Sequence, residues 1–167
     1  MGVYTRTGDG GQTGLYTGER VEKASLRVET YGTVDEVNSA LAMARAFCSN
    51  PDVRGRILDL QKDIPMLMAD LASIDKEPYI TMENVKELEQ GIDAIEALLP
   101  PLKSFIVPGA TKGGSILDFA RTVSRRAERQ LLRMAKEEKV HESDRIYLNR
   151  LSDYCFTLMR LEEKDVE

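Results

Sequence analysis

Apolar residues recur at helical spacing along most of this 167-residue chain, and this periodicity constrains the fold more than any other feature. In the stretch 25–48, the residues Val34, Val37, Leu41, Ala44 and Cys48 are spaced by 3, 4, 3 and 4 positions. Such spacing places them on one face of an α-helix. The same pattern recurs at about 51–73, 81–99, 115–138 and 143–163. Short connectors join these stretches, so the sequence predicts four or five helices packed as an antiparallel bundle.

Residues that favour helix ends mark several of the predicted boundaries. Asn50–Pro51 reads as an N-cap followed by proline in the first turn, and Thr81 and Ser143 are further candidate caps. Pro65 lies inside the second pattern and is expected to kink that helix. The sequence contains no convincing alternating strand pattern, apart from a short candidate at 105–107.

The N-terminal segment, residues 1–24, is rich in glycine and threonine. The residues of these two types within positions 5–14 are Gly8, Gly10, Gly11, Gly14, Thr5, Thr7 and Thr13. Glycine lets backbone N–H groups converge on an anion, and Arg6 and Lys23 add positive charge. No Walker A motif or G-x-G-x-x-G spacing is present. Two interpretations stay open from this segment alone: a polyphosphate-binding loop and a disordered chain end.

The stretch 115–138 carries two distinct faces. Its apolar stripe, predicted to be core, comprises Ile116, Ala120, Val123, Ala127, Leu131 and Met134. A second stripe, here called the arginine face, comprises Arg121, Arg125, Glu128 and Arg129. Like charges four residues apart destabilise an isolated helix by about 0.2–0.5 kcal/mol per pair. The arginine face is therefore either solvated or met by external anions, such as a carboxylate of another subunit or the phosphates of a ligand.

Composition and single residues exclude several classes of protein. A net charge of −5 argues against nucleic-acid or membrane-surface binding, and no apolar run has the ~18 residues of a membrane span. With no secretory signal pattern, we expect one cytoplasmic domain spanning residues 1–167. Cys48 and Cys155 are predicted to be buried thiols. A ferritin-like di-iron site would need Glu-x-x-His pairs, whereas the single histidine, His141, lies in a charged connector and is predicted to be solvated.

Four ordered motifs resemble one known family. The segments are TRTGDGGQTGLYTGERVEK, RVETYGTVDEVNSAL, FIVPGATKGGSILDFARTVSRRAER and YLNRLSDYCFTLMR. They resemble the ATP:cob(I)alamin adenosyltransferases of the propanediol-utilisation type, which include the human mitochondrial enzyme of methylmalonic aciduria. The resemblance spans nearly the whole chain and is weakest at about 50–100. It implies a five-helix bundle (25–167) behind an ordered ATP-binding segment (1–24). It also implies a homotrimer with active sites between subunits, and transfer of the 5′-deoxyadenosyl group of ATP to Co(I) with release of triphosphate.

The resemblance also implies roles for individual residues. The ATP-binding positions are Thr5, Arg6, Thr7, Gly8, Thr13, Gly14, Lys23, Arg125, Arg126, Glu128, Arg129 and Asn149. Asp35 matches a carboxylate that pairs with Arg125 across the subunit interface. Phe105 matches an aromatic residue beside the corrin that helps to remove the lower axial ligand, although a plain anchor in the core is an alternative. Arg125, Arg129, Phe105 and Asp35 are thus the expected catalytic group.

Several features depart from the family pattern or stay open. Arg6 stands where the family usually has lysine, so a planar guanidinium group replaces the compact charge of an ammonium group. Val37 stands where the family usually has leucine. Lys112 is either solvated or in contact with a corrinoid side chain. Mg²⁺ is expected to share the triphosphate without a dedicated set of protein ligands. The expected partners are ATP, a corrinoid, an electron-donating reductase and a B12-dependent acceptor enzyme. A non-catalytic ATP and corrinoid carrier or sensor is the alternative function, and the sequence does not identify the preferred corrinoid.

Overall fold

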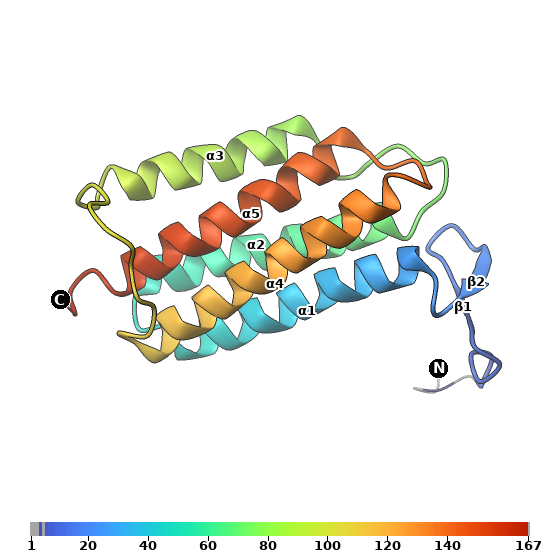
Figure 1. The fold of residues 1–167 in the computed structure, drawn as a ribbon, viewed down its shortest axis with the longest axis horizontal. Coiled ribbons are helices and arrows are strands. Elements are labelled where there is room, and N and C mark those ends of the chain that lie inside the picture. Colours follow the sequence, from blue (N-terminus) through green and yellow to red (C-terminus); the bar gives the residue numbers. More distant parts are fainter. Residues whose placement is uncertain (1–3, 5, 167) are drawn as a thin grey trace.

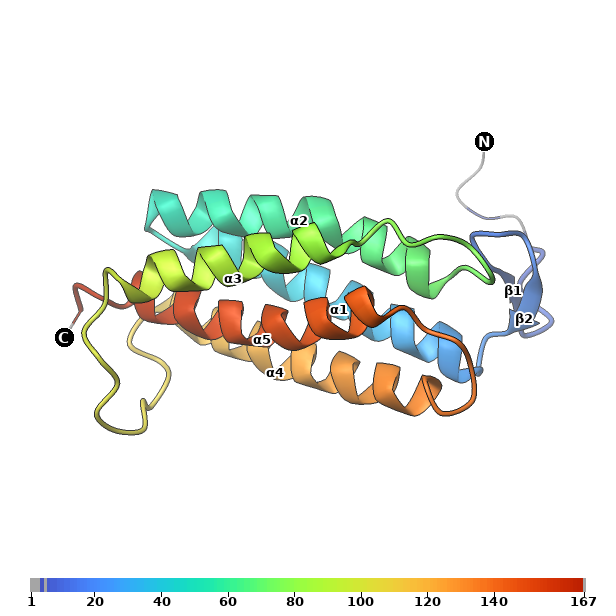
Figure 2. The ribbon, with the colours of Figure 1, turned by 90° about the horizontal axis from the view of Figure 1, so that it is seen from above.

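Five helices form the body of the molecule in the computed structural model, which describes residue 4 and residues 6–166. They are α1 (Leu26–Phe47), α2 (Pro51–Leu71), α3 (Met82–Glu96), α4 (Lys112–Met134) and α5 (Glu142–Glu162). Figures 1 and 2 show them lying side by side along a common long axis. α4 packs between α1 and α5, while α2 packs on α1 and α3 on α5. The predicted all-α five-helix bundle is confirmed.

Side-chain caps explain where most helices begin. Ser25 Oγ accepts a hydrogen bond from Val28 N at 3.5 Å, and Asn50 Oδ1 accepts one from Asp52 N at 2.9 Å. At α3, Asn84 Oδ1 accepts bonds from both the amide and the hydroxyl of Thr81, each at 3.0 Å. These groups satisfy N–H donors that have no partner within the helix. The predicted starts of α1, α2 and α3 are therefore confirmed.

Two predicted helix starts were wrong by a few residues. α4 begins at Lys112 rather than near residue 115, because Thr111 is its N-cap and accepts a bond from Gly114 N at 2.8 Å. Gly113 and Gly114, which precede the predicted start, lie inside its first turn. α5 begins after His141, which occupies the N-cap position that was predicted for Ser143.

α2 continues as a helix through Pro65, whose side chain is exposed.

The strand prediction at 105–107 was wrong, since this segment has no regular secondary structure. The strands of the described chain lie instead in the N-terminal segment. β1 (Gln12–Gly14) and β2 (Arg20–Glu22) pair antiparallel, with Thr13 opposite Val21. Each strand has three residues, which is too short for an alternating pattern to be recognised in the sequence.

The core is built from the apolar stripes of all five helices. On α4, Ala120, Ala127, Leu131 and Met134 are fully buried, and Ile116 packs at the edge of the core. Cys48 and Cys155 are buried, unpaired thiols, and burial raises the pKa of each to about 12. Both predictions are confirmed. Of the helices in the described residues, none is long and apolar enough to span a bilayer.

The two segments that carry the glycine-rich motif and Phe105 lie at opposite ends of the bundle. The β1–β2 hairpin extends beyond the start of α1, whereas the loop 100–111 extends beyond the start of α4 (Figures 1 and 2). α4 has 23 residues, so the two ends are separated by about 35 Å of helix. This separation determines which predicted site residues one chain can bring together.

Candidate functional site

Backbone turns give the glycine-rich part of the N-terminal segment a defined shape. Gly11 N donates to Gly8 O at 3.2 Å, and Lys23 N donates to Gly11 O at 2.8 Å. The Arg20 guanidinium donates to Thr7 O at 2.8 Å and to Gln12 O at 3.3 Å. The interpretation as a disordered chain end is therefore wrong for the residues the structure describes; Thr5 lies outside them. Sequence reasoning missed Arg20, because an arginine that binds only backbone carbonyls leaves no signal in spacing.

Several predicted phosphate-binding residues come together in this segment. Lys23 lies directly over Gly8, where an added Cβ would come within 2.9 Å of Lys23 Nζ. Arg6 adopts a left-handed backbone conformation with φ of 61°, and its guanidinium lies 5.5 Å from the centre of the Tyr4 ring. The side chains of Arg6 and Lys23 are exposed. Thr13 and Gly14 follow on β1. The segment thus presents two cations beside a glycine turn, which suits an anion.

The hairpin is fixed to the bundle by the end of α2 and the connector that follows it. Tyr16 N donates to Ala72 O at 2.8 Å. Lys76 Nζ lies 4.6 Å from the ring centre of Tyr16 and 4.4 Å from that of Tyr79. Leu15 is buried against the same end of the bundle. These contacts position the glycine turns relative to the helices.

The arginine face contains two guanidinium groups without protein partners. Arg121 Nε donates to Asp118 Oδ1 at 2.8 Å, so Arg121 is neutralised within its own helix. Among the residues that the structure describes, Arg125 and Arg129 form no hydrogen bond or ion pair, and both are exposed. Glu128, the carboxylate expected between the arginines, instead accepts a bond from Asn149 Nδ2 at 2.7 Å. The face therefore offers two free cations to an external anion.

Arg126 does not belong to that face and has a partner of its own. Its guanidinium forms an ion pair with Glu36 of α1, and both side chains are about half exposed. Asp35, next to Glu36 on α1, is exposed and forms no hydrogen bond or ion pair with Arg125 of its own chain in the described structure. The predicted Asp35–Arg125 pair is thus not formed within one chain.

A cavity of about 360 Å³ opens between the loop 100–111, α4 and α5. Its lining comprises Leu102, Ser104, Phe105, Ile106, Pro108, Asp118, Arg121, Arg125, Ser152, Asp153, Phe156 and Met159. Phe105 is 90% exposed at the rim of this cavity, so the alternative of a core anchor is wrong. The cavity brings Phe105 and Arg125 together. Its α5 side was missed, because those residues continue the apolar and polar pattern of an ordinary helix.

The comparisons with known proteins decide the family. The family model for cobalamin adenosyltransferase matches residues 3–162. The chain belongs to the cobalamin adenosyltransferase family. This family member is 46% identical over 167 residues to the corrinoid adenosyltransferase of Bacillus subtilis, across 96% of this chain and 86% of the relative. The resemblance drawn from the four motifs is confirmed.

Two further members extend the comparison. The corrinoid adenosyltransferase PduO of Citrobacter freundii is 44% identical over 170 residues, which cover 99% of this chain and 51% of that protein. The chain therefore spans about half the length of such relatives. A solved variant PduO-type ATP:corrinoid adenosyltransferase from Lactobacillus reuteri, complexed with cobalamin and ATP, superposes with a TM-score of 0.91 at 32% identity. That match covers 98% of this chain and 93% of the other.

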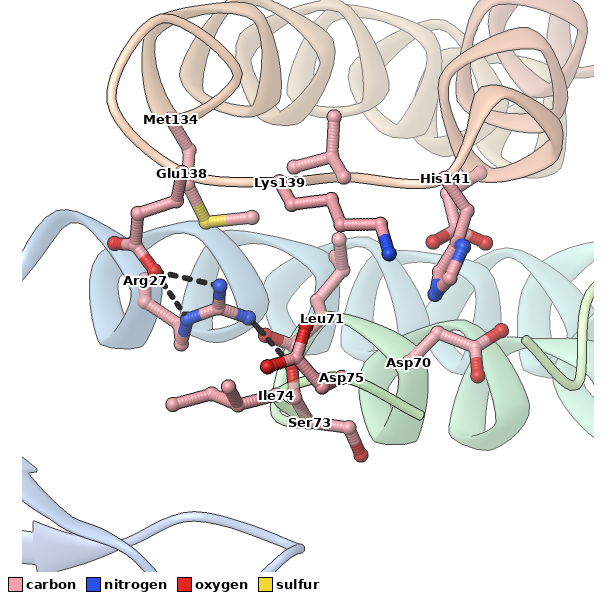
Figure 3. A pocket seen from close by; sticks show the side chains of 12 residues that line it. Arg27, Asp70, Leu71, Ser73, Ile74, Asp75, Met134, Glu138, Lys139 and His141 are labelled. Atoms are coloured by element: carbon pink, nitrogen blue, oxygen red, sulfur yellow. Dashed lines mark hydrogen bonds and ion pairs between the residues drawn. The ribbon is translucent and has the colours of Figure 1, made fainter. Parts of the chain in front are cut away.

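This cobalamin adenosyltransferase family member has a second cavity, of about 220 Å³, at the hairpin end of the bundle. Figure 3 shows Arg27 at its wall, bonded to Glu138 at 2.7 Å and to the carbonyls of Leu71 and Ser73 at 2.7 and 2.8 Å. His141 also lines this cavity and is half-buried, so the prediction of a solvated histidine was wrong. The cavity contains none of the predicted site residues. Through Arg27, an ion pair joins α1 to the α4–α5 connector, and a hydrogen bond joins α1 to α2.

Two buried carboxyl groups face each other in that cavity. Asp70 accepts bonds from Tyr79 N and Ile80 N, each at 2.8 Å. The pKa of Asp144 is raised to about 8. Burial is the largest cause, and the charge of Asp70 and a hydrogen bond to Asp70 are smaller ones. Asp144 Oδ1 has no hydrogen-bond partner among the described residues. At neutral pH Asp144 is thus mostly protonated and donates to Asp70.

Proposed function

We propose that the chain transfers the 5′-deoxyadenosyl group of ATP to the Co(I) centre of a corrinoid, with release of triphosphate. The observation that carries this proposal is the pair of unpartnered guanidinium groups of Arg125 and Arg129, the first of which borders the cavity rimmed by Phe105. One surface therefore joins free positive charge for a polyphosphate to an exposed aromatic ring for a flat macrocycle. Membership of the family and the similarity to a cobalamin- and ATP-bound structure support the same assignment.

The transfer needs positioning and charge stabilisation more than acid–base groups. The cobalt electron pair attacks the 5′-carbon, the Co–C bond forms, and the C–O bond breaks with its electrons leaving on triphosphate. Co(I) is a strong nucleophile, so the chain's work is to align the reactants and hold the leaving anion. Arg125, Arg129 and the Asn149–Glu128 pair serve this role from α4 and α5. From the N-terminal segment the proposal adds Thr5, Arg6, Thr7, Gly8, Thr13, Gly14 and Lys23, and from the rest of α4 it adds Arg126.

Mg²⁺ enters the proposal only as the ion that triphosphate brings with it. The described part of the chain has no group of three or more His, Cys, Asp or Glu side chains arranged to hold a metal. Mg²⁺ retains several waters and commonly binds through substrate phosphates, so a dedicated protein cage is not required. The residues present fit this role, because the arginines neutralise the triphosphate oxygens that the ion leaves free.

Phe105 is assigned the removal of the corrinoid's lower axial ligand. Co(II) is reduced to Co(I) more easily once its axial ligands are lost. An apolar ring pressed against that coordination position excludes both water and the nucleotide base. The 90% exposure of Phe105 supports this assignment, since a ring of that size finds no cover within its own chain.

A homotrimer with sites between subunits is part of the proposal. The N-terminal segment and the loop 100–111 lie at opposite ends of one bundle, and Asp35 and Arg125 each lack an ion-pair partner in the described chain. Exposed apolar side chains also gather on the adjoining helices α1 and α4, where Met43, Phe47 and Phe119 are each more than half exposed. A neighbouring subunit would cover these side chains and bring Asp35 to Arg125.

The remaining partners follow from the chemistry. A reductase must supply the electron for Co(I), and a B12-dependent enzyme must accept the adenosylated product. A cytoplasmic location belongs to the proposal as well, and two unpaired cysteines suit a reducing compartment.

Turnover separates this proposal from a non-catalytic carrier or sensor. The protein is incubated with ATP, cob(II)alamin and a strong chemical reductant, while the visible spectrum and the released triphosphate are measured. We expect a Co–C alkyl spectrum and one triphosphate per cobalt, and neither product when ATP is omitted. Tight binding of both ligands without spectral change would support the carrier. Parallel assays with cobinamide show which corrinoid is preferred.

A further inference from the structure

The loop that carries Phe105 (residues 100–111, the Phe105 loop) is held at both ends by the C-terminal end of α5, including its C-cap residue. Arg160 Nη2 donates to Pro100 O at 2.5 Å. Glu163 Oε1 accepts a bond from Thr111 N at 3.1 Å. Residues three apart on a helix lie on one face, so a single turn reaches both ends of the loop. We call Arg160 and Glu163 the α5 clamp.

Little else in the chain fixes the path of this loop. In the part of the structure that is described, residues 101–110 form no hydrogen bonds of their own, and all are exposed except the half-buried Ile106. Gly109 has φ of 121°, a conformation that glycine adopts without strain. The two clamp bonds and the packing of Ile106 therefore decide where the Phe105 ring stands.

The glycine pair at the start of α4 makes room for the clamp. A Cβ on Gly114 would lie 2.2 Å from Glu163 Oε1 and 2.6 Å from its Cδ. A Cβ on Gly113 would lie 2.7 Å from Cys48 Cα, which is backbone and cannot yield. With both glycines present, the Glu163 carboxylate reaches the N-terminus of α4, where a negative charge is favourable. Glu163 is only 8% exposed, so this bond is shielded from competing water.

We propose that Glu163 and Arg160 are positioning residues for Phe105, which they present to the lower face of the corrinoid. The inference rests on the proposed adenosyl transfer. Neither residue needs to touch a substrate. When a clamp bond is lost, the twelve-residue loop samples more positions, and the fraction with the ring in place falls. ATP binding should be little affected, because Arg125 and Arg129 stand on the rigid helix α4.

Glu162 supplies a matched control one residue away. Its Oε1 accepts from Ser49 N at 2.7 Å and from Ser49 Oγ at 3.0 Å, and its Oε2 accepts from Asn50 N at 3.1 Å. It is buried to the same degree as Glu163 and also lies at a helix start, that of α2. Its bonds hold the α1–α2 turn and do not touch the Phe105 loop. Glu162→Ala thus reproduces the loss of a buried carboxylate without releasing the loop.

The test compares Glu163→Ala, Glu163→Gln and Gly114→Ala with Glu162→Ala. Gly114→Ala keeps the carboxylate but pushes it away, and alanine favours helix more than glycine, so this variant should fold even where Glu163→Ala does not. Each protein is assayed from Co(II) with reductant and from chemically prepared Co(I). Electron paramagnetic resonance of the Co(II) complex measures the four-coordinate fraction, and thermal unfolding measures stability.

We expect turnover from Co(II) to fall about tenfold in Glu163→Ala and Gly114→Ala, the usual scale for a lost charge-assisted bond. Turnover from Co(I) and the KM for ATP should change less than about twofold, since those steps do not use the ring. Glu163→Gln should restore much of the four-coordinate signal, because its amide oxygen can accept from Thr111 N. Glu162→Ala should lower stability but leave the ratio of the two activities unchanged.

A four-coordinate signal at the wild-type level in folded Gly114→Ala would overturn the clamp. An equal loss from Co(II) and Co(I) in both alanine variants would also overturn it, since that is the pattern of a general structural defect. A wild-type protein without turnover even from Co(I) would instead overturn the proposed function and the clamp with it. The two failures are therefore distinguishable.

Discussion

Asn149 Nδ2 donates to Glu128 Oε1 at 2.7 Å, and this bond ties the arginine face of α4 to α5. The opposite end of the same amide accepts from Arg150 Nη1 at 2.8 Å, so both ends of the Asn149 side chain are used. Held in this way, the Glu128 carboxylate is directed toward α5. Arg125 and Arg129, one turn apart on the outer face, keep their charge available for an anion.

Replacing Asn149 by alanine should weaken ATP use. Glu128 then loses its donor and is free to turn toward the arginines, where it competes with triphosphate. A lost bond to a charged group costs about 1.5–3 kcal/mol, or roughly 10- to 150-fold in kcat/KM for ATP. Arg129→Ala should have a similar effect, with corrinoid affinity little changed. Arg133→Ala is the control, since this arginine of α4 donates to Gln130. Unchanged kinetics in both test variants would place ATP elsewhere.

Neutralising Asp35 or Arg125 should weaken both activity and assembly. Either change leaves the other charge unpaired at the proposed subunit interface, which is costly when the charge is partly buried. The charge-swapped double variant should recover part of the loss. Analytical ultracentrifugation and kinetics measure the two effects. Asp59→Asn is the matched control, because Asp59 pairs with Lys62 inside its own helix, α2. A fully active monomer at micromolar concentration would contradict the interface.

Phe105→Ala should leave the fold intact and still disable reduction of Co(II). A side chain that is 90% exposed has little burial to lose, so the stability change should be within about 0.5 kcal/mol. Turnover should collapse from Co(II) and recover substantially when Co(I) is supplied. Val107→Ala, at 81% exposure in the same loop, is the control. A four-coordinate Co(II) signal that persists in Phe105→Ala would remove this ring from the mechanism.

Asp144 should make the protein less stable as pH rises from about 4 to 8. The folded protein keeps this carboxyl protonated, with its pKa raised to about 8, whereas the unfolded chain releases the proton near the ordinary value of 3.8. The unfolded state therefore binds fewer protons across this window, and the stabilisation is full below it and lost as pH passes 8. The total is of the order of a few kcal/mol. Lys139 and His141 line the same cavity, so a charge on either side chain also acts on the Asp144 carboxyl.

Asp144→Asn removes that titration while keeping a donor toward Asp70. Urea unfolding between pH 5 and 8.5 should give a flatter profile than wild type, with the variant more stable at the alkaline end. Glu142→Gln is the control, since Glu142 lies in the same first turn of α5 and is exposed. Parallel profiles for wild type and Asp144→Asn would show that the carboxyl does not titrate as described.

Periodicity in the sequence was enough to predict the five helices, because each must bury one apolar stripe. The starts of α1, α2 and α3 were also predictable, since Ser25, Asn50 and Thr81 act through local bonds. The start of α4 was not. Gly113 and Gly114 resemble loop residues, and the reason that glycine stands there is close contact with the distant residues Cys48 and Glu163. The short strands β1 and β2 likewise depend on the end of α2 to hold them.

The candidate site was predictable where charge spacing broke an ordinary pattern and not elsewhere. Arg125 and Arg129 were recognisable because like charges on one face oppose helix stability. Asp118, three residues before Arg121 on the same helix, neutralises it; this local pair was readable from spacing and was overlooked. Glu163 belongs to a charged chain end whose residues are usually solvated, so no local signal marked it as buried. Contacts between distant segments of the chain cannot be predicted from the spacing of residues in the sequence alone.

The placement of the N-terminal segment and the Phe105 loop at opposite ends of the bundle has a consequence for mixed assemblies. Suppose that each site unites the N-terminal segment of one chain with α4 of another chain. A variant damaged only in the N-terminal segment is then inactive alone, and so is a variant damaged only in α4. Co-refolded together, they would form some interfaces at which both halves are intact. The activity regained on mixing two inactive proteins would then be proportional to the fraction of interfaces that are intact. Two variants damaged in the same segment would regain no activity.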